Sequence, residues 1–139
     1  MSTVEQTMRR SVLTVRPEES LEQAAQAMIE RRTGSAVVVT GPIGGKYIGI
    51  VTERDVLRAV AQGRIPWSTK ITEVMTADPV CVSPDVETAE AIKIMIEGGF
   101  RHLPIAKDGK LVGLVSLREM LRATALPQMG LENAEEKGQ

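Results

Sequence analysis

Two residues near the middle of the chain, Thr52 and Asp55, could together hold a polar ligand. They follow the apolar, β-favouring run Gly49–Val51, and apolar residues recur at helical spacing after them. Thr52 is a favourable helix N-cap, so the end of a strand and the start of a helix are expected within one turn of each other. Such a corner presents free backbone N–H groups, a hydroxyl and a carboxylate. We expect it to suit a phosphorylated ligand that also carries hydroxyl groups.

The same strand-to-helix pattern returns near the C-terminus. Ser116 and Glu119 lie 64 residues after Thr52 and Asp55, and both pairs are followed closely by the tripeptide Leu-Arg-Ala. An internal repeat of this size determines the architecture before any single residue does.

Periodicity and turn chemistry extend the repeat over most of the chain. The first copy is predicted to contain a short β run at 13–15, a helix behind a capping box at Ser20 and Gln23, a buried strand at 36–39, a strand at 47–51 and a helix from 52 to about 62. The second copy repeats this order, and Asp108-Gly109 predicts a tight hairpin turn in it. A short helical turn leads each copy, at 4–8 and 71–75. The helix faces predicted to be buried are Leu21, Ala24, Ala25, Met28 and Ile29 in the first copy, and Thr88, Ala91, Ile92, Met95 and Ile96 in the second.

These patterns predict an α/β (α+β) fold made of tandem, pseudo-two-fold β-α-β-β-α repeats with small mixed sheets. The repeats are expected at 1–66 and 67–126, with a mobile polar tail at 127–139 and with Trp67 packed onto the body. One copy alone would expose the apolar face of its sheet, so the two copies are expected to bury these faces against each other.

Composition narrows the function. The formal net charge is −1 and no continuous basic run occurs, so nucleic-acid binding is not expected. No signal peptide and no membrane-spanning apolar run is recognised, and the single cysteine permits neither an intrachain disulfide nor a cysteine metal site. These features favour a cytoplasmic location. Only 2% of the residues are aromatic, so the core is expected to be aliphatic and rich in methionine.

The tandem order resembles a CBS-domain pair, also called a Bateman module, and here one without an attached effector domain. The resemblance covers about 4–125. It rests on the repeat, on Gly49-x-x-Thr52-x-x-Asp55 with its echo Gly113-x-x-Ser116-x-x-Glu119, and on the stretch Arg101-His102-Leu103-Pro104.

In that family, such pairs bind adenine nucleotides or adenosyl ligands (AMP, ADP, ATP, NAD or S-adenosylmethionine) in clefts between the repeats, and they regulate a partner protein. The resemblance implies that Asp55 binds ribose hydroxyls, that Thr52 contacts ribose or phosphate, and that Arg101 and His102 face a phosphate from the opposite repeat. The residues it implies as ligand-binding are Thr14, Val15, Gly34, Ser35, Ala36, Val37, Thr52, Arg54, Asp55, Arg101, His102, Ser116 and Glu119. It implies no metal and no cofactor other than the nucleotide as regulatory ligand, together with a homodimer and an unidentified regulated protein.

Alternative interpretations remain for these residues. Thr52 and Asp55 could form only a capping box, and Glu119 is the acid that such a box prefers, so we expect a better site in the first repeat and a weak or vacant one in the second. His102 could be a packing residue and Arg54 a solvated one. The whole chain could also be a structural or oligomerisation module with vacant clefts. An enzyme is less expected, because no nucleophile with a base, no metal-ligand cluster and no P-loop is recognised.

Overall fold

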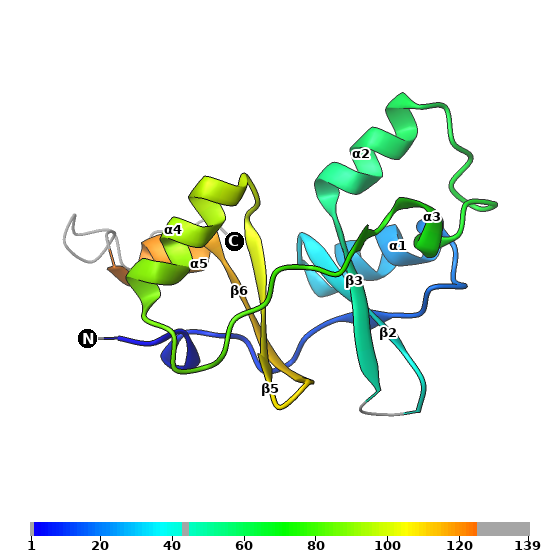
Figure 1. Cartoon of the computed structure of the whole chain (residues 1–139). Helices are drawn as coiled ribbons and strands as arrows, with labels where there is room; N and C mark the ends of the chain where they lie inside the picture. Colours follow the sequence, from blue (N-terminus) through cyan, green and yellow to red (C-terminus); the bar gives the residue numbers. More distant parts are fainter. Residues whose placement is uncertain (1, 43–44, 125–139) are drawn as a thin grey trace.

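The structure of the chain is a computed structural model, and it describes residues 2–42 and 45–124. The predicted order of two β-α-β-β-α repeats is confirmed (Figure 1). The tail predicted at 127–139 lies outside the described residues. In chain order the elements are η1 (Val4–Gln6), β1 (Thr14–Val15), α1 (Leu21–Arg31), β2 (Ser35–Thr40), β3 (Lys46–Thr52), α2 (Glu53–Ala61), α3 (Ile71–Val74), β4 (Thr76–Ala77), α4 (Thr88–Gly98), β5 (His102–Lys107), β6 (Lys110–Ser116) and α5 (Leu117–Thr124).

Two small sheets form the centre of the molecule, and the first of them is mixed. The first has the order β1-β2-β3-β4, with β1 parallel to β2 and the other neighbours antiparallel. The second is the antiparallel pair β5-β6, and isolated bridges from Arg9 to Leu114 and from Val82 to Ile105 continue it on both sides. The two sheets therefore follow the same plan, although only the first has four assigned strands.

Local sequence signals account for the turns and the helix ends. Asp108 and Gly109 both have positive φ, 52° and 79°, which is the backbone that a two-residue hairpin turn needs between β5 and β6. The capping box before α1 forms as predicted, because the Gln23 N–H donates to Ser20 Oγ at 3.1 Å. Helices α1 and α4 end at left-handed residues, Arg32 and Gly99, which are equivalent in the two repeats.

The segments that lead the two repeats are exchanged. Val4 is fully buried in the core of the second repeat, and its N–H donates to the Val86 carbonyl at 2.9 Å. Ile71 is fully buried in the core of the first repeat, where its N–H donates to the Glu19 carbonyl at the same distance. Figure 1 shows the N-terminal segment running beside β5 and β6 before it reaches β1. Each repeat therefore completes the other's core.

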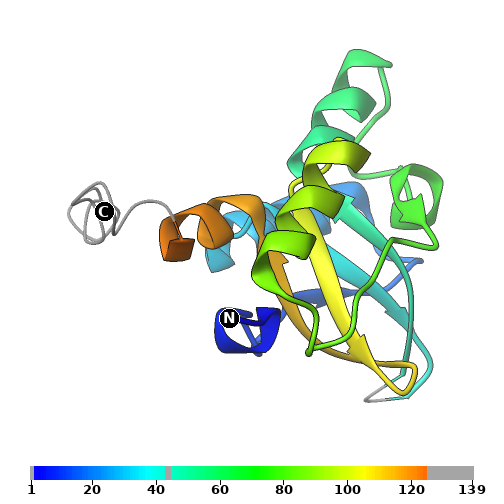
Figure 2. The ribbon, with the colours of Figure 1, turned by 60° about the vertical axis from the view of Figure 1, so that its left-hand side comes forward.

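A third apolar cluster joins the two sheets. Val37, Ile50 and Leu114 are its buried members, and Ile50 and Leu114 are equivalent residues of β3 and β6. Figure 2 shows the sheets one in front of the other, with both hairpins at the same end, while α2 extends away from them. The predicted packing of two apolar faces around a pseudo-two-fold axis agrees with this arrangement.

Three apolar side chains lie where the sequence did not predict them. Ile29 of α1 and Ile96 of α4, at equivalent positions, are 79% and 63% exposed. The sheets are narrow and cover only the stripe around Met28 and Met95, so a residue one position further around the helix reaches solvent. Trp67 is 69% exposed and does not pack onto the body. Among the described helices, none combines the length and apolar character needed to cross a membrane.

Candidate ligand-binding site at the seam between the repeats

Both strand-to-helix junctions lie at the end of the sheets opposite the hairpins. Thr52 pairs with Ser35 at the end of β3, and Ser116 pairs with His102 at the end of β6. We call this region the seam and define it by Gly34, Ser35, His102 and the two helix starts 52–55 and 116–119. The first half-site is Thr52 with Asp55, and the second half-site is Ser116 with Glu119.

In the first half-site, Asp55 is buried and holds its own helix. Asp55 Oδ2 accepts from the Thr52 N–H at 2.8 Å and from the Thr52 hydroxyl at 3.2 Å. Oδ1 accepts from Nη1 of Arg58, one turn further along α2, at 3.0 Å. The side chain of Asp55 is 5% exposed, whereas that of Arg58 is 54% exposed. The capping box predicted as the structural alternative therefore forms, and a cation on the same helix balances the acid.

In the second half-site, Glu119 is held by a residue from the far end of the chain. Its N–H donates to Ser116 Oγ at 3.1 Å, and the Ser116 hydroxyl donates to Oε1 at 3.0 Å. Oε2 accepts from Nε of Arg9 at 2.9 Å. Arg9 also exchanges two backbone hydrogen bonds with Leu114, at 2.9 and 3.0 Å, so its backbone is fixed beside the end of β6.

The backbone amides at both helix starts are largely occupied. The Glu53 N–H donates to the Gly34 carbonyl at 3.0 Å, and the equivalent Leu117 N–H donates to the Arg101 carbonyl at 2.8 Å. The Asp55 N–H donates to Thr52 Oγ1 at 3.4 Å. The expectation that this corner presents free N–H groups is therefore wrong for these amides. The cause is that each helix start is bonded to the residue that precedes the neighbouring strand.

His102 of the second repeat lies against Gly34 of the first. A Cβ atom added at Gly34 would come within 3.2 Å of Cε1 and Nε2 of the imidazole, and it would also meet the Glu53 carboxylate. Glycine at position 34 thus allows two side chains from different repeats to approach the same backbone. Of the small residues predicted to leave room for a base, Gly34 is the one that lies against His102.

The pKa of His102 is lowered, chiefly because burial disfavours the charged imidazolium. The carboxylates of Glu53 and Glu119 act in the opposite direction, and the guanidinium groups of Arg101 and Arg9 add to the lowering. The imidazole therefore senses charges from both helix starts, Glu53 on one and Glu119 on the other. An added phosphate would favour its protonated form.

Two buried polar atoms at the seam have no hydrogen-bond partner within the described residues. They are Oγ of Ser35, which is 1% exposed, and Nδ1 of His102. These residues are equivalent, since each is the first residue of the central strand of its repeat. Ser35 shares its strand face with Val37, which packs between the repeats. A buried polar atom without a partner costs about 1–3 kcal/mol, so such atoms are rare and call for an explanation.

The other predicted ligand-binding residues are dispersed. Val15 and Ala36 are buried in the core of the first repeat, and Val37 is buried between the sheets, so their side chains are committed to packing. Arg54 and Arg101 are exposed. Thr14 is also exposed, but it lies in a groove at the hairpin end of the sheets.

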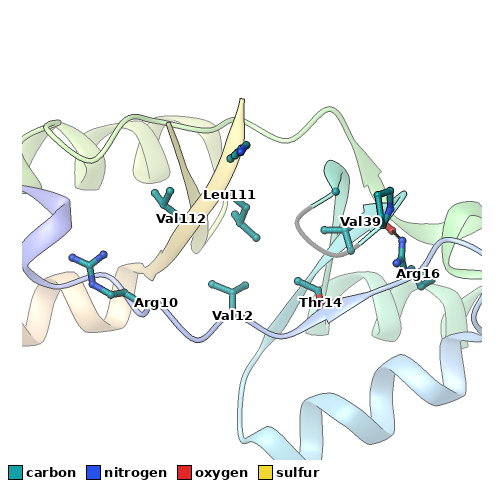
Figure 3. A pocket seen from close by; sticks show the side chains of 10 residues that line it. Arg10, Val12, Thr14, Arg16, Val39, Leu111 and Val112 are labelled. Carbon is teal, nitrogen blue, oxygen red and sulfur yellow. Dashed lines mark hydrogen bonds between the residues drawn. The ribbon is translucent and has the colours of Figure 1, made fainter. Parts of the chain in front are cut away.

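That groove is apolar with basic edges. It measures about 410 Å³, and in Figure 3 Val12, Thr14 and Val39 lie on one side with Leu111 and Val112 on the other. Three cations, Arg10, Arg16 and Lys110, also line it, and Arg16 Nη1 donates to the Val39 carbonyl at 3.5 Å.

The equivalent place on the other side of the pseudo-two-fold axis differs in its side chains. Tyr47 takes the position of Leu111, and Cys81 takes that of Thr14. A hydrogen bond to Cys81 raises the pKa of Tyr47, and burial raises the pKa of the Cys81 thiol. These two side chains therefore lie beside each other, and the raised pKa of Cys81 gives no sign of a reactive thiolate.

Sequence reasoning missed Arg9, Arg58 and Glu53. Arg58 could have been found, because a cation three residues after an acid on a helix lies beside it. Arg9 is 110 residues from Glu119, so no local pattern connects the two. The one sequence signal is that the equivalent residue of the second repeat, Thr76, is uncharged. In the part of the chain that the structure describes, no group of three or more His, Cys, Asp or Glu side chains could hold a metal ion.

The fold and the paired half-sites define a tandem-repeat module. The CBS domain family matches this chain twice, at residues 4–62 and 71–126. The chain therefore belongs to the CBS-domain family and carries two CBS repeats, as the sequence motifs predicted.

Similar proteins agree with this assignment. The CBS domain-containing protein YhcV of Bacillus subtilis is 36% identical over 135 residues, which cover 96% of this chain and 91% of YhcV. A structure described as a signal-transduction protein with CBS domains, from Burkholderia ambifaria, has a TM-score of 0.85 at 34% identity and covers 91% of this chain and 96% of its own. The CBS domain pair of the protein MJ0100, in complex with 5′-methylthioadenosine and S-adenosyl-L-methionine, has a TM-score of 0.80, covering 88% of this chain and 95% of its own. Its identity of 22% shows a shared fold only.

Proposed function

We propose that this chain is a regulatory module that binds an adenine nucleotide or adenosyl ligand at the seam and signals its presence to a partner protein. The ligand lies between the two repeats and uses the first half-site for its ribose. The adenosyl compounds bound to the CBS pair of MJ0100 support this class of ligand, since the two proteins share a fold.

The observation that carries the proposal is the pair of unpartnered atoms, Ser35 Oγ and His102 Nδ1. A core that only had to pack would favour apolar or partnered side chains at both positions, because each unpartnered atom costs stability. A hydroxyl that can donate or accept and an imidazole nitrogen suit the polar edge of a base or ribose.

Asp55 is the group best placed to hold a ribose. An ionised carboxylate has about four acceptor positions. Thr52 and Arg58 supply three of the donors to Asp55. Arg58 is half-exposed and can turn toward solvent, which would release a further position on Oδ1. A ribose diol can then replace the guanidinium without unfolding the helix start.

The first test is a thermal-shift and calorimetric screen of AMP, ADP, ATP, NAD and S-adenosylmethionine. A ligand that binds only the folded state stabilises it by RT ln(1 + [L]/Kd), about 2.7 kcal/mol at a hundredfold excess over Kd. We expect at least one adenine compound to raise the melting temperature more than its guanine counterpart. An unchanged melting curve with all five compounds would favour the structural-module alternative.

A sharper test separates binding from stability at one residue. Ser35→Ala removes the unpartnered hydroxyl, so we expect the free energy of unfolding to stay level or rise by about 1 kcal/mol. Affinity for the ligand should fall about fivefold or more, because a hydrogen bond to it is lost.

Thr69→Val is the matched control for Ser35→Ala. Thr69 is also buried, but its hydroxyl already donates to the Ile65 carbonyl at 2.7 Å, away from the seam. We expect this variant to lose stability and to keep its affinity. If Ser35→Ala also loses stability and keeps its affinity, the seam is a packing feature and the proposal fails.

We propose a homodimer as the form that signals. Leu57 and Val60 of α2 are 70% and 58% exposed, on a helix that extends away from the sheets. Burying such a face against a second copy with two-fold symmetry would remove this apolar surface from water. Light scattering of the wild type should give twice the monomer mass, and Leu57→Asp should give the monomer mass. A monomer mass for the wild type at tens of micromolar would contradict the dimer.

The enzyme alternative finds less support. Within the described residues, His102 Nδ1 has no hydrogen-bond partner, so no nucleophile is paired with it there. The two acids of the half-sites, Asp55 and Glu119, cap their helices. The residues of the seam are equipped to bind and to respond, which is the proposed regulatory role.

A further inference from the structure

The two half-sites differ in which segment balances their acid, and the difference suggests how many ligands one chain holds. Asp55 is balanced by Arg58, which lies on the same helix and is half-exposed. Glu119 is balanced by Arg9, which comes from the segment that leads the first repeat and is fixed to β6 by two backbone hydrogen bonds. The two arginine side chains are similarly exposed, 54% for Arg58 and 50% for Arg9, so exposure does not distinguish the half-sites. Both repeats carry an arginine one turn along the helix, Arg58 and Arg122, so Arg9 is an additional cation that only the second half-site receives.

We propose that Arg9 is a built-in competitor that closes the second half-site, so that the chain binds one ligand at the first half-site. This inference rests on the proposed function. The Arg9 guanidinium donates to Glu119 Oε2 at 2.9 Å, as a ribose hydroxyl would have to do. Because Arg9 is covalently part of the chain, its effective concentration at Glu119 exceeds that of a free ligand.

The equivalent residue in the other repeat supports this asymmetry. Thr76 lies opposite Ile50 on β4, as Arg9 lies opposite Leu114 beside β6. Threonine is short and uncharged, so nothing at this place competes for Asp55. The sequence difference between residues 9 and 76 thus distinguishes the half-sites independently of the difference between Asp55 and Glu119.

The structure also indicates that the exchange of leading segments allows this control. The segment that carries Arg9 belongs to the first repeat in sequence, yet it packs on the second repeat beside Glu119. A change in the N-terminal segment would therefore act on the half-site of the other repeat.

The test measures binding stoichiometry by calorimetric titration with AMP and, in parallel, with S-adenosylmethionine. We expect one equivalent per chain for the wild type and two for Arg9→Thr, which copies the residue at position 76. Arg9→Thr combined with Asp55→Ala should return to one equivalent, now at the second half-site. Arg9→Thr combined with Glu119→Ala should also return to one, at the first.

Two matched controls keep the test specific. Arg9→Lys retains a cation that can reach Glu119, so we expect one equivalent. Arg10→Thr removes a neighbouring arginine whose nearest acid is Glu5, at 4.0 Å, and it should also leave one equivalent. All variants should melt within a few degrees of the wild type, because a partly exposed ion pair contributes little to stability. If Arg9→Thr does not fold, Arg9→Gln removes the charge and retains most of the side-chain volume.

The outcomes separate this inference from the proposed function. One equivalent for both the wild type and Arg9→Thr overturns the inference and leaves the function intact, as do two equivalents for the wild type. No binding by the wild type but one equivalent for Arg9→Thr supports the inference and overturns the assignment of the first half-site. No binding by either protein overturns both.

Discussion

The two helix starts at the seam have the same backbone plan and different chemistry. Thr52 with Asp55 and Ser116 with Glu119 both cap their helices, and the first amide of each helix donates to the residue just before a strand of its own repeat. The partner of the acid differs, since Arg58 is local and Arg9 is distant. Because the fold tolerates either arrangement, folding alone does not choose between them. The comparison teaches that a duplicated fold can keep two equivalent capping boxes while their acids pair with arginines from different segments.

The groove at the hairpin end shows a second difference between equivalent positions. The groove is lined by Thr14 and Leu111, and the equivalent positions carry Cys81 and Tyr47. Both differences arise from side chains on matching backbones. The repeats are therefore equal in architecture and unequal in side-chain chemistry.

The largest expected effect is on the free energy of unfolding, and it tests whether the two repeats fold independently. Ile71→Ala removes a fully buried side chain that the second repeat inserts into the core of the first. We expect a loss of about 2–5 kcal/mol in the free energy of unfolding, and a smaller loss of roughly 2 kcal/mol for the equivalent Val4→Ala.

Urea denaturation followed by circular dichroism measures both losses. Each variant should unfold in a single transition, since each leading segment completes the other repeat's core. Two separate transitions would show that the repeats fold independently, and would contradict the view that each leading segment completes the core of the other repeat.

How much of this structure the sequence predicts depends on the range of the interactions. The hairpin at Asp108 and Gly109 and the box at Ser20 follow from neighbouring residues, and they were predicted correctly. The exchange of leading segments was not, because the pattern around Val4 shows an apolar turn and not the core that it enters. Helical periodicity likewise overestimated the buried faces, since Ile29 reaches solvent beside a narrow sheet.

The site divides in the same way. The capping role of Thr52 and Asp55 is local and was predicted, whereas the Arg9 to Glu119 pair joins residues 110 positions apart. The meeting of His102 with Gly34 depends on how the repeats dock, which no local pattern contains. The ligand roles of the seam residues stay predictions.

The second prediction tests the open half-site directly. Asp55→Ala removes the carboxylate that we expect to hold the ribose, at a cost of roughly 1.5–3 kcal/mol for each charge-assisted hydrogen bond. Affinity for the best adenine ligand should fall on the order of tenfold to a hundredfold or more. Folding should lose only about 1 kcal/mol, as for a helix cap. Calorimetric titration beside melting curves measures both quantities, and unchanged affinity would mean that Asp55 only caps its helix.

The third prediction is the reciprocal change. Glu119→Ala removes a capping acid and its ion pair with Arg9, so we expect a loss of about 1 kcal/mol in stability. Affinity at the first half-site should change by less than about twofold, because we propose that Arg9 occupies the second half-site and the ligand binds at the first. The same titration decides the matter. Loss of tight binding in Glu119→Ala, with binding retained in Asp55→Ala, would show that the half-sites are assigned the wrong way round.

The smallest expected effect concerns the only charge difference between the two equivalent strand starts. Ser35 does not titrate, whereas His102 does, and His102 is the one histidine in the sequence. Its pKa in the folded protein is lowered, chiefly by burial, against about 6.5 in the unfolded chain. Between these two values the unfolded chain binds more protons, so stability falls as the pH falls. We therefore expect the free energy of unfolding to be level above about pH 6.5 and to decrease below it.

Urea titrations from about pH 7.5 down to pH 5, with His102→Asn as the control, measure this dependence. This is roughly the pH range in which histidine is the side chain that changes charge. The variant should lose the decrease, because no other histidine titrates there. AMP should reduce the decrease in the wild type, since a phosphate beside the imidazole favours its protonated form. A stability that rises on acidification would mean that Glu53 and Glu119 outweigh burial at His102. The second repeat would then present a cation to the seam without any ligand, and the contrast between Ser35 and His102 would become one of charge.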